Sequence, residues 1–237
     1  MSFDFEEIDY QQTPLGDVSL RRRAEPRLNG LIIHEVKLGE EFLMSSLFTE
    51  AEIQLSKLAL ALLPDENLDI VVGGLGLGYT TAAALETTAV KSLTVIDVMQ
   101  PVIDWHNDHL VPLGQVISSD SRCSLVQGDF FEMAVDTGFD SNHPGRKYDA
   151  ILLDIDHSPA RWLNSGNGQF YTELGLGEMA KQLHDGGVFG LWSDDPPDHE
   201  FTALLTGVFG QASAHLIEFA NPYTGEDSTN SVYLATN

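Results

Sequence analysis

Short, nearly continuous runs of apolar residues recur along the middle of the chain. Each run is four to six residues long, is rich in Val, Ile and Leu, and is followed within two residues by Gly or Asp. Such continuous apolarity is typical of strands in a parallel sheet, because these are buried on both faces. The spacing of about 25 to 40 residues leaves room for a crossover helix between strands. The pattern predicts βαβ units with strands at residues 68–72, 92–96, 123–126, 150–153 and 187–192.

The segments between these runs have helical character, beginning in one case in a glycine-rich turn and in another after Pro101. Two further β-rich runs near the end of the chain flank a turn-rich segment, which predicts an antiparallel hairpin at one sheet edge. The expected fold class is therefore α/β, with a mostly parallel sheet of seven strands. The predicted helices are residues 79–86, 102–110 and 170–184, and the predicted hairpin strands are residues 214–219 and 231–235.

The first fifty residues follow another pattern, with short strand-like runs separated by glycine-containing turns. They predict a small hairpin sheet with strands at residues 18–22, 31–36 and 41–45, followed by a helix at residues 50–63. We therefore divide the chain into an N-terminal β-hairpin region with its connecting helix, residues 1–62, and a larger α/β domain, residues 63–237.

Charge narrows the classes of partner. The chain has 12 Lys and Arg against 36 Asp and Glu, a formal net charge of −24. Nucleic-acid binders and proteins that bind anionic membranes depend on basic side chains, so we expect neither kind of partner. No apolar run reaches the ~18 residues of a membrane span, and the acidic N-terminal residues differ from a signal peptide. We expect a cytoplasmic protein, and cationic or zwitterionic ligands remain open.

A glycine-rich turn follows the first predicted parallel strand. Gly74, Gly76 and Gly78 alternate with leucines and lead directly into a predicted helix. Glycine lets the backbone turn tightly and approach a ligand, and a helix N-terminus offers free N–H groups. The turn is therefore a candidate cofactor-binding site.

Acidic residues follow the next two strands. Asp97 ends the second strand, where a carboxylate can accept hydrogen bonds from ribose hydroxyls. Asp129 follows the third, where its carboxylate can accept from the amine of adenine while Phe130 covers the base. Because the carboxyl ends of parallel strands meet at one edge of the sheet, these residues and the glycine turn together predict a nucleoside site.

This arrangement resembles the class I AdoMet-dependent methyltransferase fold. Within it, the chain is most similar to the spermidine synthases, the polyamine aminopropyltransferases, over roughly residues 30–235. The resemblance implies a Rossmann-like domain behind a small N-terminal β-sheet, a homodimer, and a role in polyamine biosynthesis. It implies transfer of an aminopropyl group from decarboxylated S-adenosylmethionine (AdoMet) to an amine. The residues that carry it are 94–97 (TVID), 101–103 (PVI), 122–129 (RCSLVQGD), 147–159 (KYDAILLDIDHSP), 170–171 (FY) and 185–188 (DGGV).

The acids after the fourth strand are the candidate catalytic groups. The implied reaction is attack of a primary amine on a carbon beside a sulfonium. An amine with a pKa near ~10 is protonated at neutral pH, so a carboxylate must position it and accept its proton. We assign Asp154 to this role with Asp156 as its partner, and the resemblance implies a substrate-side position for Tyr223. The predicted substrate-binding residues are Trp192, which can stack on a cation, Asp194, which can pair with it, and His157.

Departures from the family pattern keep other functions open. Gly76 stands where the aminopropyltransferases have an aspartate that holds the amine of decarboxylated AdoMet. Methyl transfer from intact AdoMet is therefore an alternative, and so is a nucleoside-binding protein without activity. The family's second acid in the loop after the fourth strand also follows two serines, one position later than Asp156. Its tyrosine in the helix entering the main domain is absent here, and that helix offers Glu50, Glu52 and Gln54 instead.

Histidine spacing gives little support for a metal. His106 and His109 are three residues apart in a predicted helix, and we place them on its exposed side. His157 lies beside two aspartates, but the chain offers no other ligand spacing typical of a metal site. We predict no metal cofactor.

Overall fold

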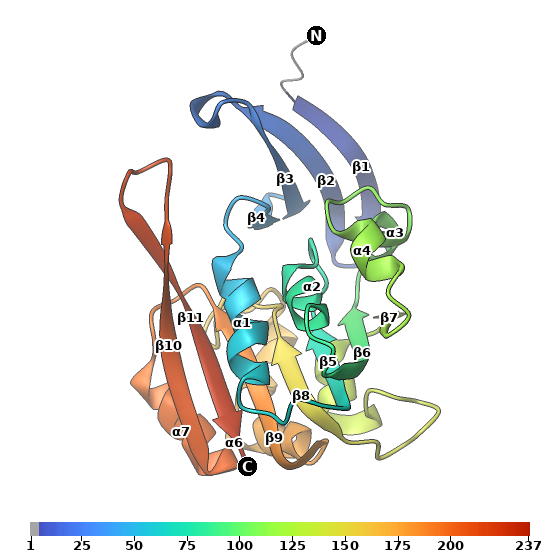
Figure 1. Ribbon diagram of the computed structural model, residues 1–237, viewed down its shortest axis with the longest axis vertical. Coiled ribbons are helices and arrows are strands. Elements are labelled where there is room, and N and C mark those ends of the chain that lie inside the picture. The colour runs from blue at the N-terminus through green and yellow to red at the C-terminus, as the bar shows by residue number, and fades with distance from the viewer. Residues whose placement is uncertain (1–4) are drawn as a thin grey trace.

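The computed structural model describes residues 5–237 and contains two β-sheets (Figure 1). The smaller sheet lies over the carboxyl ends of the parallel strands of the larger one. The first four residues of the predicted N-terminal region lie outside the described residues. The smaller sheet is an antiparallel meander whose strands pair in chain order. Its strands are β1 (Phe5–Thr13), β2 (Gly16–Glu25), β3 (Leu31–Leu38) and β4 (Glu41–Ser45), with a 3₁₀ turn, η1 (Pro26–Leu28), between β2 and β3.

The larger sheet has seven strands in the order β10-β11-β9-β8-β5-β6-β7. The pairs β5–β6, β5–β8, β6–β7 and β8–β9 are parallel, whereas β11 runs antiparallel to both β9 and β10. The expected fold class, with its antiparallel edge, is confirmed. The strands of the larger sheet are β5 (Leu68–Gly73), β6 (Val90–Asp97), β7 (Cys123–Gln127), β8 (Tyr148–Leu153), β9 (Leu183–Ser193), β10 (Gln211–Ala220) and β11 (Asp227–Thr236).

Helices cover both faces of this sheet. The longest are α1 (Glu50–Leu60) and α7 (His199–Phe209). Helix α1 packs on β8, β9 and β11, so it covers the larger sheet although it follows the N-terminal strands directly. No helix within residues 5–237 is both long and apolar enough to cross a membrane. The other helical segments are α2 (Tyr79–Leu85), α3 (Gln100–Asn107), α4 (Gly114–Ser118), α5 (Phe130–Glu132), the π-helical η2 (Met133–Thr137), the 3₁₀ segment η3 (Ser165–Gln169) and α6 (Glu173–Ala180).

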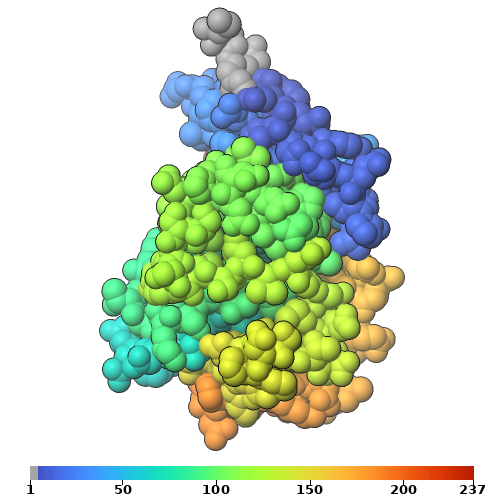
Figure 2. Space-filling view, turned by 90° about the vertical axis from the view of Figure 1, so that its right-hand side faces the viewer, coloured from blue at the N-terminus to red at the C-terminus, as the bar shows by residue number. Residues whose placement is uncertain are grey.

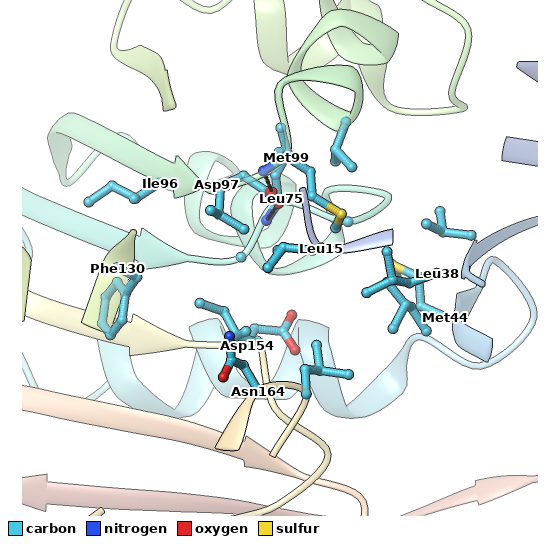
Figure 3. Close-up of a pocket in the computed structure, with 18 of the residues that line it drawn as sticks. Leu15, Leu38, Met44, Leu75, Ile96, Asp97, Met99, Phe130, Asp154 and Asn164 are labelled. Atoms are coloured by element: carbon cyan, nitrogen blue, oxygen red, sulfur yellow. Dashed lines mark hydrogen bonds between the residues drawn. The ribbon is translucent and has the colours of Figure 1, made fainter. Parts of the chain in front are cut away.

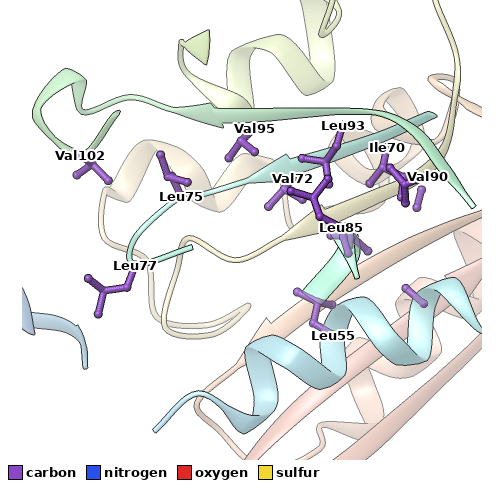
Figure 4. Close-up of a cluster of buried hydrophobic side chains, with 14 of the residues drawn as sticks. Leu55, Ile70, Val72, Leu75, Leu77, Leu85, Val90, Leu93, Val95 and Val102 are labelled. Carbon is purple, nitrogen blue, oxygen red and sulfur yellow. The ribbon is translucent and has the colours of Figure 1, made fainter. Parts of the chain in front are cut away.

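Alternation along the strands divides the core into two layers. In β5, Ile70 and Val72 point to the layer that contains Leu55 of α1, whereas Val71 between them points to the opposite layer. Figure 4 shows Leu55 directed from α1 toward the strands that carry Ile70 and Val72. Because each side chain is buried on its own face, the strands read as continuous apolar runs in the sequence.

The N-terminal sheet lies over the edge of the larger sheet where the parallel strands end. In Figure 1 the arrowheads of β6 and β8 point toward it. Figure 2 shows the blue N-terminal sheet against the green surface that includes α3, and the Trp105 indole N–H donates to Asp9 of β1 at 2.6 Å. Strand order reverses at β5, which has β6 on one side and β8 on the other, and a crevice forms at such a switch point.

Candidate functional site

A cavity of about 410 Å³ occupies this switch point, within the range of small-molecule sites. The carboxyl ends of β5, β6, β7 and β8 form its floor, and apolar side chains of the N-terminal sheet form its roof. Figure 3 shows Leu38 and Met44 closing one end, Phe130 at the other, and Asp97 and Asp154 along the sides.

The glycine turn passes between the floor and the roof. Gly74 has a φ of +93° and Gly76 a φ of +48°, in the left-handed region that favours glycine. A Cβ on Gly74 would overlap the carbonyl oxygen of Asp154, and one on Gly76 would overlap the Met44 sulfur. Gly78 caps α2 with a φ of +90° and does not line the cavity. Glycine is therefore required by close packing as well as by backbone conformation.

His106 holds the glycine turn from behind. Its Nε2 lies 3.0 Å from the carbonyl oxygen of Gly76, and the side chain is fully buried. Burial lowers the pKa of His106 to about 4, so the ring is neutral near pH 7. The expectation that His106 lies on the exposed side of its helix is wrong, because α3 turns this residue toward the turn and not toward solvent. His109 lies beyond the end of α3.

Asp97 joins the turn to the end of β6. Its carboxylate accepts the backbone N–H of Leu75 at 3.0 Å and that of Met99 at 2.8 Å. Burial raises the pKa of Asp97, and the N–H donors oppose that rise. A carboxylate oxygen can accept more than one hydrogen bond, and Asp97 lines the cavity, so the group is compatible with the expected ribose contact.

Asp129 and Phe130 lie on the next strand end. One oxygen of Asp129 accepts the backbone N–H groups of Phe131 at 2.9 Å and Glu132 at 3.2 Å, which caps α5. Phe130 is buried, and its ring centroid lies 5.6 Å from that of Phe131 and 6.0 Å from that of Phe170. Asp129, Phe130 and Phe131 all line the cavity, so this end offers an acceptor beside an aromatic surface.

Two carboxylates, one buried and one partly buried, line the cavity from different elements. Asp154 follows β8 and accepts the Thr80 hydroxyl at 2.6 Å. Glu52, on α1, is 8% exposed. Burial raises the pKa of both groups. The charge of Asp154 raises the pKa of Glu52 further, whereas the Thr80 hydrogen bond lowers the pKa of Asp154. The sequence named Glu52 as one of three possible amine contacts, and the structure places it in the cavity.

Three further side chains surround this acid pair. Tyr79, Trp192 and His157 line the cavity near the ends of α2, β9 and β8. The Trp192 indole N–H is buried and has no hydrogen-bond partner within residues 5–237. His157 contacts Glu41 of the N-terminal sheet, with 2.8 Å between Nε2 and Oε1. The loop after β8 is thus tied to the roof.

Asp156 does not line the cavity, although it follows the same strand as Asp154. It is 1% exposed and accepts the Tyr171 hydroxyl at 2.8 Å, the Leu163 N–H at 2.7 Å and the Asn167 side-chain amide at 2.9 Å. These bonds order residues 157–171, several of which line the cavity. The predicted catalytic role of Asp156 would require this network to rearrange, and it stays a prediction.

Asp194 and Tyr223 also lie outside the cavity lining. Asp194 accepts from Arg161 at 3.0 Å and from Asn230 at 3.1 Å. The Tyr223 hydroxyl donates to Glu25 at 3.0 Å and accepts from Arg23 at 2.8 Å, which joins the β10–β11 loop to the N-terminal sheet. The predicted substrate contacts of these two residues stay predictions.

The charge of the cavity has one sign. Its acids are Glu52, Asp97, Asp129 and Asp154, and within the described chain neither Lys nor Arg lines it. No group of three or more His, Cys, Asp or Glu side chains suited to a metal ion is found in residues 5–237. The lining therefore favours an elongated ligand that has a polar, aromatic-stacking end and a positively charged end.

Comparison with known proteins gives a consistent picture. No family model matches the chain. A polyamine aminopropyltransferase from Sulfolobus acidocaldarius is 31% identical over 121 residues, covering 49% of this chain and 36% of that protein. The match thus spans little more than a third of the relative's length.

Solved structures extend the likeness in fold to almost the whole chain. A spermidine synthase in complex with the transition state analogue AdoDATO has a TM-score of 0.74 at 17% identity, covering 97% of this chain and 73% of that one. The spermidine synthase from Thermotoga maritima has a TM-score of 0.71 at 16% identity, with coverages of 97% and 72%. Human methyltransferase-like protein 13 in complex with SAH has a TM-score of 0.56 at 17% identity, with coverages of 78% and 77%.

The sequence match covers about half of the chain. The structural likeness covers nearly all of it, so it includes the N-terminal sheet as well as the larger domain. The chain therefore has the fold of the spermidine synthases, and about half of it is similar in sequence to part of a polyamine aminopropyltransferase.

Proposed function

We propose that this protein is a transferase that moves an aminopropyl group from decarboxylated AdoMet to a polyamine-type amine. The observation that carries the proposal is the pairing of two ends in one cavity. The glycine turn, Asp97 and Asp129 suit a nucleoside at one end, and Glu52 and Asp154 suit a cationic amine at the other. The likeness to the spermidine synthases and the polyamine aminopropyltransferase supports this assignment. A homodimer, expected from the same family, is part of the proposal.

In the proposed reaction, the acceptor amine attacks the aminopropyl carbon bonded to the sulfonium sulfur. The new C–N bond forms as the C–S bond breaks, and the bonding electrons return to sulfur to leave neutral methylthioadenosine. The nitrogen of the acceptor amine then loses a proton, which Asp154 accepts. Burial raises the pKa of Asp154 and makes it a better base than an exposed aspartate. The Thr80 hydroxyl orients its carboxylate.

Methyl transfer from intact AdoMet is the second candidate, and Gly76 favours it. This position carries no acid to hold the donor's amine, and its φ of +48° and the overlying Met44 sulfur leave no room for a side chain. The human methyltransferase-like neighbour, solved with SAH, has the same fold over 78% of this chain.

Ligand binding and product mass separate the candidates. The purified chain is titrated calorimetrically with decarboxylated AdoMet, AdoMet and methylthioadenosine, and is then incubated with each donor and putrescine or longer amines. An aminopropylated product supports the first proposal, a methylated product supports the second, and nucleoside binding without any product supports a binding protein.

An active-site variant ties the activity to the cavity. Asp154→Asn is expected to lower the turnover rate about 100-fold or more, as for loss of a general base, while methylthioadenosine still binds. Glu50→Gln is the matched control, because the Glu50 side chain pairs with Gln54 and does not line the cavity. Equal rates for the Asp154 variant and the wild type would contradict the assignment of the base.

A further inference from the structure

Glu52 occupies an unusual position for an acid. It belongs to α1, the helix that covers the larger sheet, yet its side chain reaches the cavity and is 8% exposed. A carboxylate withdrawn from water to this degree is costly unless it is paired or protonated. Within the described residues, no Lys or Arg forms an ion pair with Glu52, and neither residue type lines the cavity.

Asp154 is partly buried, and within residues 5–237 the cavity lining offers no Lys or Arg to pair with it. It lines the same cavity, and its side-chain donor is the Thr80 hydroxyl. Thr80 also lies 3.3 Å from the carbonyl oxygen of Glu52, so one threonine contacts both α1 and the residue after β8. The backbones that carry the two acids are thereby fixed relative to each other, and their separation does not depend on a mobile loop.

Within the described residues, neither Lys nor Arg is among the groups that line the cavity around the pair. Tyr79 faces it from α2, and burial together with the charge of Glu52 raises the pKa of this phenol, so it stays neutral. Asp97 and Asp129 lie at the ends of β6 and β7. His157, from the segment after β8, has Glu41 as its partner. A positive charge for the pair must therefore come from the ligand.

We propose that Glu52 and Asp154 form a receptor for one ammonium group, and that Glu52 selects a donor whose alkyl chain ends in an ammonium without a carboxylate. This inference rests on the proposed function, because the nucleoside end defines which ligand brings the chain here. A donor that keeps its carboxylate would place a further negative charge beside Glu52 and Asp154. The receptor thus supplies the discrimination that Gly76, with no side chain, cannot supply.

The receptor also couples binding to proton release. Without a ligand, Glu52 keeps its proton near neutral pH, because burial and the charge of Asp154 raise its pKa to about 8. An ammonium favours the doubly ionised pair and displaces that proton. Methylthioadenosine has no ammonium and leaves the proton in place.

The test compares Glu52→Gln with Glu50→Gln, a change at the first residue of the same helix. Calorimetry at pH 7.5 in two buffers of different ionisation enthalpy gives both the affinity and the protons released for decarboxylated AdoMet, AdoMet and methylthioadenosine. We expect Glu52→Gln to bind decarboxylated AdoMet ~10 to 100-fold more weakly, as for loss of one charged contact, and to release fewer protons. Its methylthioadenosine affinity should equal that of the wild type, and Glu52→Asp should restore part of the preference.

The inference is overturned if Glu52→Gln binds decarboxylated AdoMet as tightly as the wild type, or if it loses methylthioadenosine to the same extent. It is also overturned if the wild type does not prefer decarboxylated AdoMet over AdoMet. Failure of the proposed function is a different result. In that case the wild type prefers decarboxylated AdoMet and Glu52→Gln loses this preference, but no aminopropylated amine forms. The receptor is then supported and the proposed reaction is not.

Discussion

Replacing Thr80 with valine removes the hydroxyl that donates to Asp154 and keeps nearly the same side-chain volume. Thr80 is 2% exposed, and the two oxygens lie 2.6 Å apart, so water does not replace the lost donor. A hydrogen bond to a charged acceptor contributes about 1.5 to 3 kcal/mol. At 1.36 kcal/mol per pKa unit, its loss is worth roughly one to two units. The hydroxyl lowers the pKa of Asp154, so the Thr80→Val change raises it further above its ordinary value.

The measurable consequence is a shift in the pH dependence of ligand binding. An ammonium binds best when Asp154 is ionised, so the pH at which decarboxylated AdoMet reaches half of its maximal affinity should rise by roughly one to two units. Calorimetric titrations between about pH 5 and pH 9 cover this range, because burial raises the carboxyl pKa from its ordinary position near 4.

Thr81→Val is the matched control for Thr80→Val. The neighbouring Thr81 hydroxyl is fully buried and has no hydrogen-bond partner within residues 5–237. The same chemical change there should leave the pH profile in place and should not lower stability. If the Thr80 and Thr81 variants bind with the same pH midpoint as the wild type, Thr80 does not set the charge of Asp154 and the argument fails.

Three further outcomes test the site and its support. Burial raises the pKa of Glu52 and Asp154, so above the ordinary carboxyl pKa the folded state holds more protons than the unfolded chain, and stability falls as pH rises toward the raised values. Glu52→Gln should therefore unfold at a higher urea concentration than the wild type at pH 8 but not at pH 4. Equal gains in stability at both pH values would refute this. Gly74→Ala should lower the free energy of unfolding by at least about 1 to 2 kcal/mol and remove most of the methylthioadenosine affinity, because φ is +93° and the new Cβ meets a backbone carbonyl. A urea midpoint equal to that of the wild type would show that the turn relaxes. Tyr223→Phe should lose about 1 kcal/mol through its bond to Glu25 while binding methylthioadenosine normally; a selective loss of ligand affinity would instead return Tyr223 to the site.

The larger sheet could be predicted from the sequence because its strands are buried on both faces. The alternation that places Val71 opposite Ile70 and Val72 uses apolar residues on each side, so strand position and parallel pairing follow from composition and spacing. The N-terminal strand β1 was missed, since a sheet edge with one exposed face permits polar residues such as those in FEEIDYQQT. Helix α7 was missed as well, although Asp198 caps its start and Phe201, Leu205 and Phe209 follow at intervals of four.

The predicted helix at residues 170–184 shows the opposite error. The structure has a short helix, α6, and β9 already begins at Leu183, within the predicted range. Phe170 and Tyr171 are buried as aromatic packing residues and not as part of a long helix face. Apolar residues at roughly helical spacing satisfied the pattern, whereas tertiary contacts between aromatic rings determined their actual conformation.

The site was predictable where the chain itself fixes direction. Gly74, Asp97, Asp129 and Asp154 follow strands that end at one edge, and the structure brings all of them to the cavity. For residues in the connecting segments, the direction in which a side chain points was not predictable from the sequence. Asp156 is two positions from Asp154, but its carboxylate turns away to bind the segment that returns past Tyr171. Adjacent acids in a loop can face opposite ways, and only the packing of the loop decides which one faces a ligand.

Net charge proved less informative than the placement of a few acids. Of 36 Asp and Glu, four line the cavity, and others are paired on the surface or with the arginine cluster of β2, where Arg21 and Arg23 both bind Glu35. The acid that the sequence could not single out is Glu52, because its role depends on α1 crossing the larger sheet beside Asp154. In the unliganded protein, this carboxylate pair, whose pKa values are raised, lowers stability as pH rises. Such a pair is expected where a ligand supplies the missing positive charge, and that expectation connects the stability of this fold to its proposed function.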